Sequence, residues 1–261
     1  MSSIKSVSII GSGNVATHMA IALYSTGIDV ASIYSRNLGH AKLLADMVSA
    51  KYVDVIEDIR HDSDLYLFSV SDRAIESLAS KLYLNVGKNV LVAHTSGMLT
   101  SGIFSDYFTS FGSFYPLQTF KKSRAVNMKE VPFLITANDS GAKKKLYDLA
   151  RKISDNVNIL DDEKRKVLHV AAVFANNFTN YMYRISENIV DRENLDFDLL
   201  KPLIKETAMK ILDGQDPNKV QTGPAIRNDL NTIKAHLDYL DIDYTAKKVY
   251  ELLTESIIST K

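Results

Sequence analysis

The first 160 residues alternate short apolar runs with stretches whose apolar residues are spaced three and four apart. Short continuous apolar runs are typical of strands that are buried on both faces of a sheet. The spacing of Ala16, Met19, Ala20 and Leu23 is typical of a helix with one buried face. Repeated strand, helix and strand units predict a parallel sheet. The runs predicted as strands are residues 7–10, 30–34, 65–70, 90–93, 111–115, 133–136 and 156–160.

The pattern changes near residue 160. Only two of the eleven glycines lie after residue 141, so turns become rare. The acidic residues 161–162 can cap a helix whose apolar spacing continues to about residue 190. We therefore expect an α/β fold, with a parallel-sheet domain over residues 1–160 and an all-α domain over residues 161–261. The further helices predicted are residues 197–212, 229–240 and 244–258.

Composition narrows the class of protein. A hydrophobic fraction of 46% fits a globular chain with a substantial core. Thirty-one basic residues balance thirty-one acidic ones, so no net positive charge attracts nucleic acid or anionic membranes. The chain has no cysteine, which excludes disulfides and agrees with a reducing compartment. No apolar run reaches membrane-spanning length, and no signal-peptide pattern opens the sequence. We expect a cytoplasmic protein without membrane or nucleic-acid partners.

A glycine-rich turn follows the first predicted strand and precedes a helical pattern. Gly11 and Gly13 form a G-x-G-x-x-A motif that ends at Ala16. In this setting the first glycine permits a tight turn, the second lets backbone approach a diphosphate, and the helix N-terminus favours the anion. The alternative is a glycine turn that binds no ligand. The residues expected to contact the diphosphate are Gly11, Ser12, Gly13, Asn14 and Val15.

The end of the second predicted strand indicates which dinucleotide is bound. An acidic residue is expected there for NAD, but the sequence has Ser35, Arg36 and Asn37 instead. A guanidinium can hold a 2′-phosphate through two parallel hydrogen bonds, so we expect NADP as the cofactor. Alternatively, Arg36 is a solvated arginine at the start of a helix.

Two further strand ends meet the same edge of a parallel sheet. Val70 and Ser71 follow one strand, and His94 and Thr95 follow the next, so we expect these four residues to border the coenzyme. Ser96 could bind a substrate carbonyl or carboxylate, or cap a following helix together with Thr95. The six histidines are scattered without metal-ligand spacing, so we expect no metal.

Two groups of motifs resemble known families. Residues 10–16 and 35–37 resemble the coenzyme turn of pyrroline-5-carboxylate reductases and 6-phosphogluconate-type dehydrogenases. A more specific set resembles candidate NADP oxidoreductases that join a Rossmann-like domain to a helical domain of unknown function (the 2520 type). The resemblance implies a Rossmann-type fold, bound NADP and a homodimer in the cytoplasm. The motifs of this set are residues 94–97, 112–120, His169 with residues 176–177, and residues 222–229.

The resemblance also indicates the catalytic residues. In 6-phosphogluconate-type enzymes a lysine one turn before an asparagine donates the proton, and here Val173 stands at that place. His169, one turn earlier on nearly the same face, is our candidate general acid, with a structural helix histidine as the alternative. Asn177 and Ser96 would hold the substrate.

A polar turn over residues 222–229 carries both an arginine and an acid. We expect Arg227 to bind an anionic substrate, with Asp229 or Thr222 as the residue that orients Arg227. The alternative is that Arg227 and Asp229 only stabilise the helical domain, with Asp229 or Asn228 capping a helix.

These expectations give a function. The chain would transfer a hydride between NADPH and a small, anionic carbonyl or imine substrate at the domain boundary. An imine reductase of the pyrroline type is the closest enzymatic alternative. A protein that binds NADP(H) as a sensor or regulatory module, without turnover, is the alternative from another class.

Overall fold

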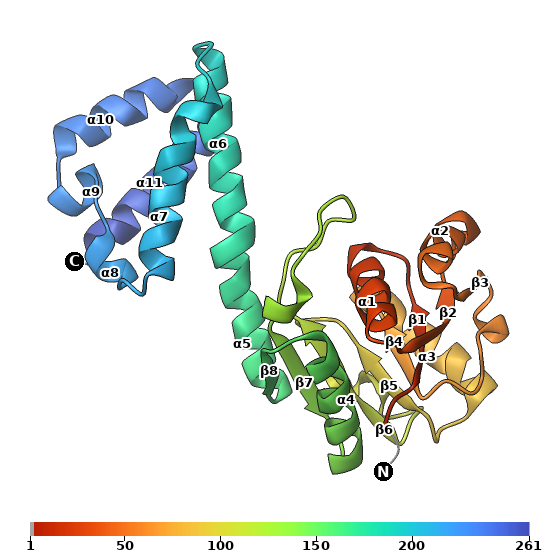
Figure 1. Ribbon diagram of the computed structural model, residues 1–261. Helices are drawn as coiled ribbons and strands as arrows, with labels where there is room; N and C mark the ends of the chain where they lie inside the picture. Colours follow the sequence, from red (N-terminus) through yellow and green to blue (C-terminus); the bar gives the residue numbers. More distant parts are fainter. Residues whose placement is uncertain (1–2, 261) are drawn as a thin grey trace. The chain divides into compact units, whose positions relative to one another are not determined.

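The computed structural model describes residues 3–260 and divides into two compact units, one ending at Asn176 and one beginning at Asn177. The first unit contains one sheet flanked by helices, and the second is helical (Figure 1). The strands are β1 (Ser6–Ile10), β2 (Asp29–Tyr34), β3 (Lys51–Val53), β4 (Leu65–Phe68), β5 (Leu91–His94), β6 (Ser110–Pro116), β7 (Phe133–Ala137) and β8 (Val157–Ile159).

The sheet has the order β3-β2-β1-β4-β5-β6-β7-β8. Strands β2, β1, β4, β5 and β6 pair in parallel, as predicted, and the order reverses at β1 and β4. The short strand β3, which was not predicted, pairs in parallel with β2. Strand β7 pairs antiparallel to β6, and β8 runs parallel to β7. The purely parallel direction expected for these last strands is therefore wrong. The segment between β6 and β7 contains no crossover α-helix, so the chain returns beside β6 in the opposite direction.

Helices cover both faces of the sheet. One core cluster joins the strands to α1, α2 and α4, with Leu23 and Leu146 fully buried, and another packs α3 against Phe68 and Phe104. Covering both faces explains why the strands are continuous apolar runs rather than alternating ones. The α-helices of this unit are α1 (Asn14–Ser25), α2 (Leu38–Val48), α3 (Asp72–Val86), α4 (Ser140–Ile153) and α5 (Asp162–Ala172), with 3-10 turns η1 (Ile56–Asp58), η2 (Ser101–Phe104) and η3 (Met128–Glu130).

A helical stretch spans the division between the units. Helix α5 continues through a π-helical turn, η4 (Val173–Phe178), into α6 (Thr179–Arg192). The sheet ends at Ile159, and the division into compact units lies within η4. The domain boundary at residue 160 remains a prediction.

The second unit is built from helices, as the sequence indicated. Asp243 caps α11 by accepting a hydrogen bond from the Ala246 N–H at 3.0 Å. Within residues 3–260, no helix has both the length and the apolar character needed to cross a membrane. Besides α6, the helices are η5 (Phe197–Leu200), α7 (Lys201–Leu212), α8 (Pro217–Val220), α9 (Pro224–Arg227), α10 (Leu230–Tyr239), η6 (Leu240–Ile242) and α11 (Tyr244–Ser259).

Candidate functional site

The turn between β1 and α1 contains two glycines, Gly11 and Gly13, and the structure gives a different reason for the missing side chain at each. Gly11 has φ +130°, and a Cβ there would lie 2.2 Å from the carbonyl oxygen of Ser69, so the fold itself requires glycine. A Cβ at Gly13 would meet no atom within 4 Å. Packing therefore does not demand Gly13, and its missing side chain leaves open space directly before the N-terminus of α1. A diphosphate fits this cradle of backbone N–H groups.

The ends of β1 and β2 are linked by side chains. The Ser12 hydroxyl donates a hydrogen bond to Ser35 Oγ at 2.8 Å, and the Asn37 N–H donates to the same Ser35 oxygen at 3.3 Å. Asn37 Oδ1 caps α2 by accepting from the His40 N–H at 3.0 Å. These bonds fix the segment that carries Arg36 beside the glycine turn.

A pocket of about 790 Å³ lies at this edge of the sheet, around the point where the strand order reverses. Its lining includes seven of the predicted coenzyme residues: Gly11, Ser12, Gly13, Ser35, Arg36, Val70 and Ser71. Arg73 and Lys81, which we did not predict, line it from one face of α3. Their spacing around Ser77, four residues each way, is the sequence signal that could have identified them. None of the lining residues is acidic, so the pocket offers three cations to a phosphorylated ligand.

The other predicted coenzyme residues do not line this pocket. Asn14 begins α1, and its Oδ1 accepts a hydrogen bond from the Lys122 N–H at 3.3 Å. Val15 is half-buried and packs against the core. Thr95 donates through Oγ1 to Ser69 Oγ at 3.2 Å. Their contacts with a coenzyme remain predictions.

His94 lies at the end of β5 with its side chain fully buried against Phe104. Its Nδ1 accepts from the Ser96 N–H at 3.2 Å, whereas its Nε2 has no hydrogen-bond partner among the described residues. Burial, reinforced by the positive charge of Arg165, lowers the pKa of His94 from 6.5 to about 4. The imidazole is therefore neutral near pH 7, and its side chain does not enter the pocket; its proposed contact with a coenzyme remains a prediction.

The hydroxyl of Ser96 is occupied by local hydrogen bonds. It donates to Asp72 Oδ2 at 2.9 Å and accepts from the N–H groups of Met98 and Leu99 at 3.2 and 3.0 Å. Ser96 thus caps a local turn, whereas the next helical turn, η2, is capped by Thr100, whose Oγ1 accepts from the Gly102 N–H. A substrate role for Ser96 remains a prediction.

Three of the motifs meet around His169. The Tyr115 hydroxyl lies 2.9 Å from His169 Nδ1, and the two rings meet edge to face with centroids 5.8 Å apart. A Cβ at Gly97 would lie 2.4 Å from His169 Nδ1 and 2.9 Å from Tyr115 Cζ. Only glycine therefore leaves room for this pair of rings. Burial raises the pKa of Tyr115, so its hydroxyl is protonated.

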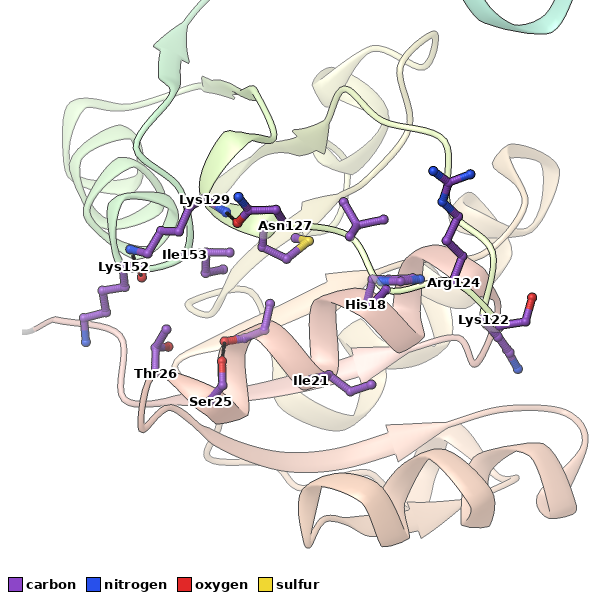
Figure 2. Close-up of a pocket in the computed structure, with 15 residues that line it drawn as sticks. His18, Ile21, Ser25, Thr26, Lys122, Arg124, Asn127, Lys129, Lys152 and Ile153 are labelled. Carbon is purple, nitrogen blue, oxygen red and sulfur yellow. Dashed lines mark hydrogen bonds between the residues drawn. The ribbon is translucent and has the colours of Figure 1, made fainter. Parts of the chain in front are cut away.

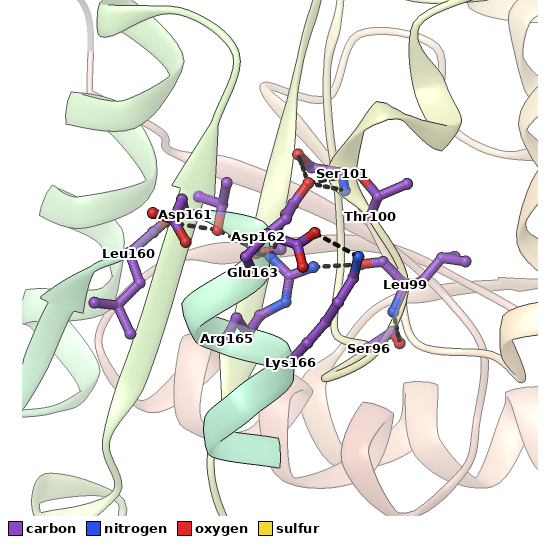
Figure 3. A network of polar contacts seen from close by, with 12 residues as sticks. Ser96, Leu99, Thr100, Ser101, Leu160, Asp161, Asp162, Glu163, Arg165 and Lys166 are labelled. Carbon is purple, nitrogen blue, oxygen red and sulfur yellow. Dashed lines mark hydrogen bonds and ion pairs between the residues drawn. The ribbon is translucent and has the colours of Figure 1, made fainter. Parts of the chain in front are cut away.

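One turn before His169, Arg165 is fully buried in a polar network (Figure 3). Its Nη1 donates to Asp162 Oδ1 at 2.6 Å, to Ser113 Oγ at 2.7 Å and to Thr136 Oγ1 at 2.9 Å, and its Nη2 donates to the Leu99 carbonyl. The network thus fastens α5 to β6, β7 and the loop after β5. We did not predict Arg165, because an arginine in the first turns of a helix is usually solvated.

Asp162 supplies the counter-charge for Arg165. Its Oδ2 also accepts from the Thr100 hydroxyl at 2.6 Å and from the Ser101 N–H at 2.9 Å. Burial opposes ionisation of this carboxyl, but the hydrogen bonds from Thr100 and Arg165 outweigh it and lower the pKa of Asp162 below its usual range. The buried guanidinium is therefore matched by an ionised carboxylate.

The remaining predicted catalytic residues belong to the second unit. Asn177 lies in η4, and π-helical turns of this kind are frequent at functional sites. Arg227 ends α9 and is exposed. Asp229 caps α10, accepting from the Thr232 hydroxyl at 2.7 Å and the Thr232 N–H at 3.1 Å, and these bonds lower its pKa. Roles for these three residues in a substrate site remain predictions.

Within residues 3–260, no group of three or more histidine, aspartate and glutamate side chains could hold a metal ion. The features that fit a ligand are the open cradle at Gly13 and the basic pocket beside it.

Two family models match the chain. Residues 6–95 match the model described as NADP oxidoreductase, coenzyme F420-dependent, and residues 131–257 match a domain of unknown function, DUF2520. L-aspartate dehydrogenase of Methanocaldococcus jannaschii is 28% identical over 93 residues, which is 35% of this chain. The chain thus spans about a third of the length of that enzyme, 34%.

Solved structures resemble the chain over nearly its full length. A reductive aminase from Aspergillus terreus, in complex with NADPH and ethyl-5-oxohexanoate, has a TM-score of 0.70 and 15% identity, with 99% of this chain and 95% of that chain covered; at this identity it shows the fold alone. The protein BF3122 of Bacteroides fragilis, described as a candidate NADP oxidoreductase, has a TM-score of 0.92 and 39% identity, with 98% of each chain covered. The chain therefore belongs to the family of BF3122, with an N-terminal part that matches the NADP oxidoreductase model and a C-terminal part that matches DUF2520.

Proposed function

We propose that the protein is an NADP-dependent oxidoreductase that transfers a hydride between NADPH and a small, anionic carbonyl or imine compound. The observation that carries this proposal is the pocket beside the glycine turn, which three cations and no carboxylate line. The NADP oxidoreductase model matched by residues 6–95 and the NADPH bound to the structurally similar reductive aminase support it.

The residues around the turn would hold the coenzyme. The N–H groups at Gly13 and the start of α1 would bind the diphosphate, because Gly13 leaves the space open. Arg36, with Arg73 and Lys81 from α3, would bind the 2′-phosphate, which carries charge that NADH lacks. When bound, NADPH supplies the hydride.

His169 would move the proton. The Tyr115 hydroxyl and His169 Nδ1 form one hydrogen bond, in which the hydroxyl can either donate or accept. As general acid, His169 would act in its imidazolium form and pass its Nε2 proton to the substrate oxygen or nitrogen as the neighbouring carbon becomes reduced, leaving a neutral imidazole whose Nδ1–H donates to the Tyr115 oxygen. Ser96, Asn177 and Arg227 would bind the substrate, and Asp229 would orient Arg227.

A second candidate function is a sensor that binds NADP(H) without turnover. The observation that favours it is apolar Val173, which stands one turn after His169 where the 6-phosphogluconate-type enzymes carry a lysine. Such a protein would respond to the ratio of reduced to oxidised coenzyme.

The two functions differ in consumption of NADPH. The test is to follow oxidation of NADPH with a panel of oxo acids, aldehydes, and ketones mixed with amines. We expect multiple turnovers with a subset of these compounds, lost in His169→Ala at unchanged affinity for NADPH and retained in His40→Ala, which alters an exposed histidine. Tight binding of NADPH without consumption would favour the sensor, and failure to bind any pyridine nucleotide would exclude both functions.

We also propose that the protein acts as a cytoplasmic homodimer. In the second unit Leu203, Leu212 and Leu252 are 64%, 77% and 68% exposed, which suits burial against a second copy. Light scattering during size-exclusion chromatography should give twice the chain mass of 29.1 kDa.

A further inference from the structure

A second groove, of about 480 Å³, lies between α1, the segment over residues 122–129 and the end of α4 (Figure 2). It shares no lining residue with the pocket beside the glycine turn, which is proposed above to hold the coenzyme and is called the coenzyme pocket below. All its walls belong to the first unit. Its size is within the range of sites that hold small molecules.

The floor of this groove is apolar and fixed. Ala22 and Ile153 are only 6% and 3% exposed, and both belong to the main core cluster of the sheet unit. Val126 and Met128 pack against the same cluster, and Ile21 adds an exposed apolar side chain. A ligand with an apolar body would therefore find a preformed surface to cover.

The rim of the groove is basic. Lys129 and Lys152 lie at one end, and Lys122 and Arg124 at the other (Figure 2). No acidic residue lines the groove. Lys129 approaches Asp155 at 3.8 Å, whereas no salt bridge within residues 3–260 involves Lys122, Arg124 or Lys152. Since the chain as a whole has zero net charge, this concentration of cations is a local feature.

The wall that carries these cations is tied to α1 without any ligand. His18 Nε2 lies 3.0 Å from the Lys121 carbonyl oxygen, and the Lys122 N–H donates to Asn14 Oδ1 at 3.3 Å. The ring of His18 also contacts the ring of Phe120, with centroids 4.7 Å apart and the ring planes tilted by 34°. Because this wall is already ordered, less conformational entropy is lost when a ligand binds.

We propose that this groove binds a small organic anion with an apolar body, a class that includes aryl and alkyl carboxylates and phosphate monoesters. Lys122 and Arg124, which lie at the same end of the rim, would hold the anionic group, and the floor would cover the apolar part. The site is separate from the coenzyme pocket, so the proposal does not depend on the proposed function.

The probe for the test is phenyl phosphate, titrated against the full-length protein by ligand-observed NMR. We expect saturable binding at least about ten-fold tighter than that of inorganic phosphate or benzyl alcohol, because the groove offers both charge and apolar surface. Lys122→Gln combined with Arg124→Gln should weaken binding by about ten-fold or more. Ser25→Phe, which fills the groove from an exposed position on α1, should weaken it similarly.

The matched control removes the same charge elsewhere. Lys88→Gln combined with Lys205→Gln alters two exposed lysines outside the groove and should change the affinity less than two-fold. Equal weakening in this control would show general attraction to lysines and overturn the proposal. Competitive displacement of phenyl phosphate by NADPH would also overturn it, because the probe would then occupy the coenzyme pocket. If Ser25→Phe changes the circular dichroism spectrum, the protein has been perturbed, and the affinities of the two charge variants for phenyl phosphate then test the proposal.

Discussion

The hydroxyl of Tyr115 lies 2.9 Å from Nδ1 of His169, although the two residues are 54 positions apart in the chain. Tyr115 is at the end of β6 and His169 is on α5, so the contact joins the sheet edge to the helix that follows the sheet. Because the tyrosine is only 9% exposed, this hydrogen bond can hold the imidazole ring in one orientation, whichever of the two groups donates.

Replacing Tyr115 by Phe tests this contact. The loss of one partly buried hydrogen bond should lower the free energy of unfolding by about 1 kcal/mol, measured by urea denaturation. Turnover with any substrate found for the wild type should fall by about ten-fold or more, because the imidazole ring then loses the hydrogen bond that orients it, while the affinity for NADPH stays unchanged. Unchanged turnover would mean that Tyr115 does not orient the histidine.

Gly97→Ala should displace His169 without removing it. The added Cβ would lie 2.4 Å from Nδ1 of the imidazole, so the ring must shift. We expect turnover to fall as far as in His169→Ala, with NADPH affinity within two-fold of the wild type. Gly102→Ala is the matched control, since its Cβ would meet only Thr100 Oγ1 at an ordinary 3.5 Å. Full activity of Gly97→Ala would contradict a role for this histidine position.

Asp162→Asn should destabilise the first unit strongly. It leaves the buried Arg165 guanidinium without its counter-charge, and breaking a buried ion pair in this way costs about 3 kcal/mol. Glu163→Gln, next to it but 81% exposed at the side chain, should change stability by less than about 0.5 kcal/mol. Thermal unfolding of both variants checks the difference, and similar melting temperatures would show that the network does not stabilise α5 on the sheet.

Stability should fall on acidification through His94. Its pKa is about 4 when folded and about 6.5 when unfolded, so between these values the unfolded chain binds more protons and stability decreases as pH falls. The full effect is on the order of 3 kcal/mol, reached below the folded pKa. Asp162, whose folded pKa is lowered, adds a loss at still lower pH.

The variant for this prediction is His94→Leu, which cannot titrate. Urea denaturation at pH 7, 6, 5 and 4 should show a flatter dependence than the wild type, whereas His40→Gln, at an exposed histidine, should retain the wild-type slope. Identical slopes for His94→Leu and the wild type would mean that His94 takes up its proton normally in the folded protein.

The three cations of the pocket proposed to hold the coenzyme should make the affinity for NADPH higher than the affinity for NADH. Arg36→Ala and Arg73→Ala should each weaken binding of NADPH by about ten-fold or more, as loss of a charge-assisted hydrogen bond implies, and change binding of NADH less than three-fold. Lys88→Ala, outside the pocket, should affect neither. Equal affinities of the unaltered protein for NADPH and NADH would contradict the assignment of the 2′-phosphate site.

Much of the fold could be predicted from local patterns. The continuous apolar runs identified most strands because both faces of the sheet are covered, and the capping acid Asp161 marked the start of α5. The short strand β3 was not predicted, because its three residues include only one that is buried. Strand direction is not encoded in periodicity, so the antiparallel turn from β6 to β7 could not be foreseen from the apolar run at residues 133–136.

The site was predictable only where it is local. The turn at Gly11 and Gly13 and the arginine after β2 can each be recognised from a few neighbouring residues, and they line one pocket. Arg165 and Tyr115 form hydrogen bonds with residues more than 50 positions away in the chain. Arg165 donates to Ser113, and Tyr115 contacts His169. No spacing rule reports such contacts.

The tight fit at Gly97 bears on how this arrangement could be transferred to another protein of the same architecture. If only the tyrosine and the histidine were grafted, the residue at the position of Gly97 would normally carry a side chain, and its Cβ would occupy the space that the two rings need. The smallest transferable unit is thus three positions on three separate segments, one of which contributes nothing but the absence of a side chain.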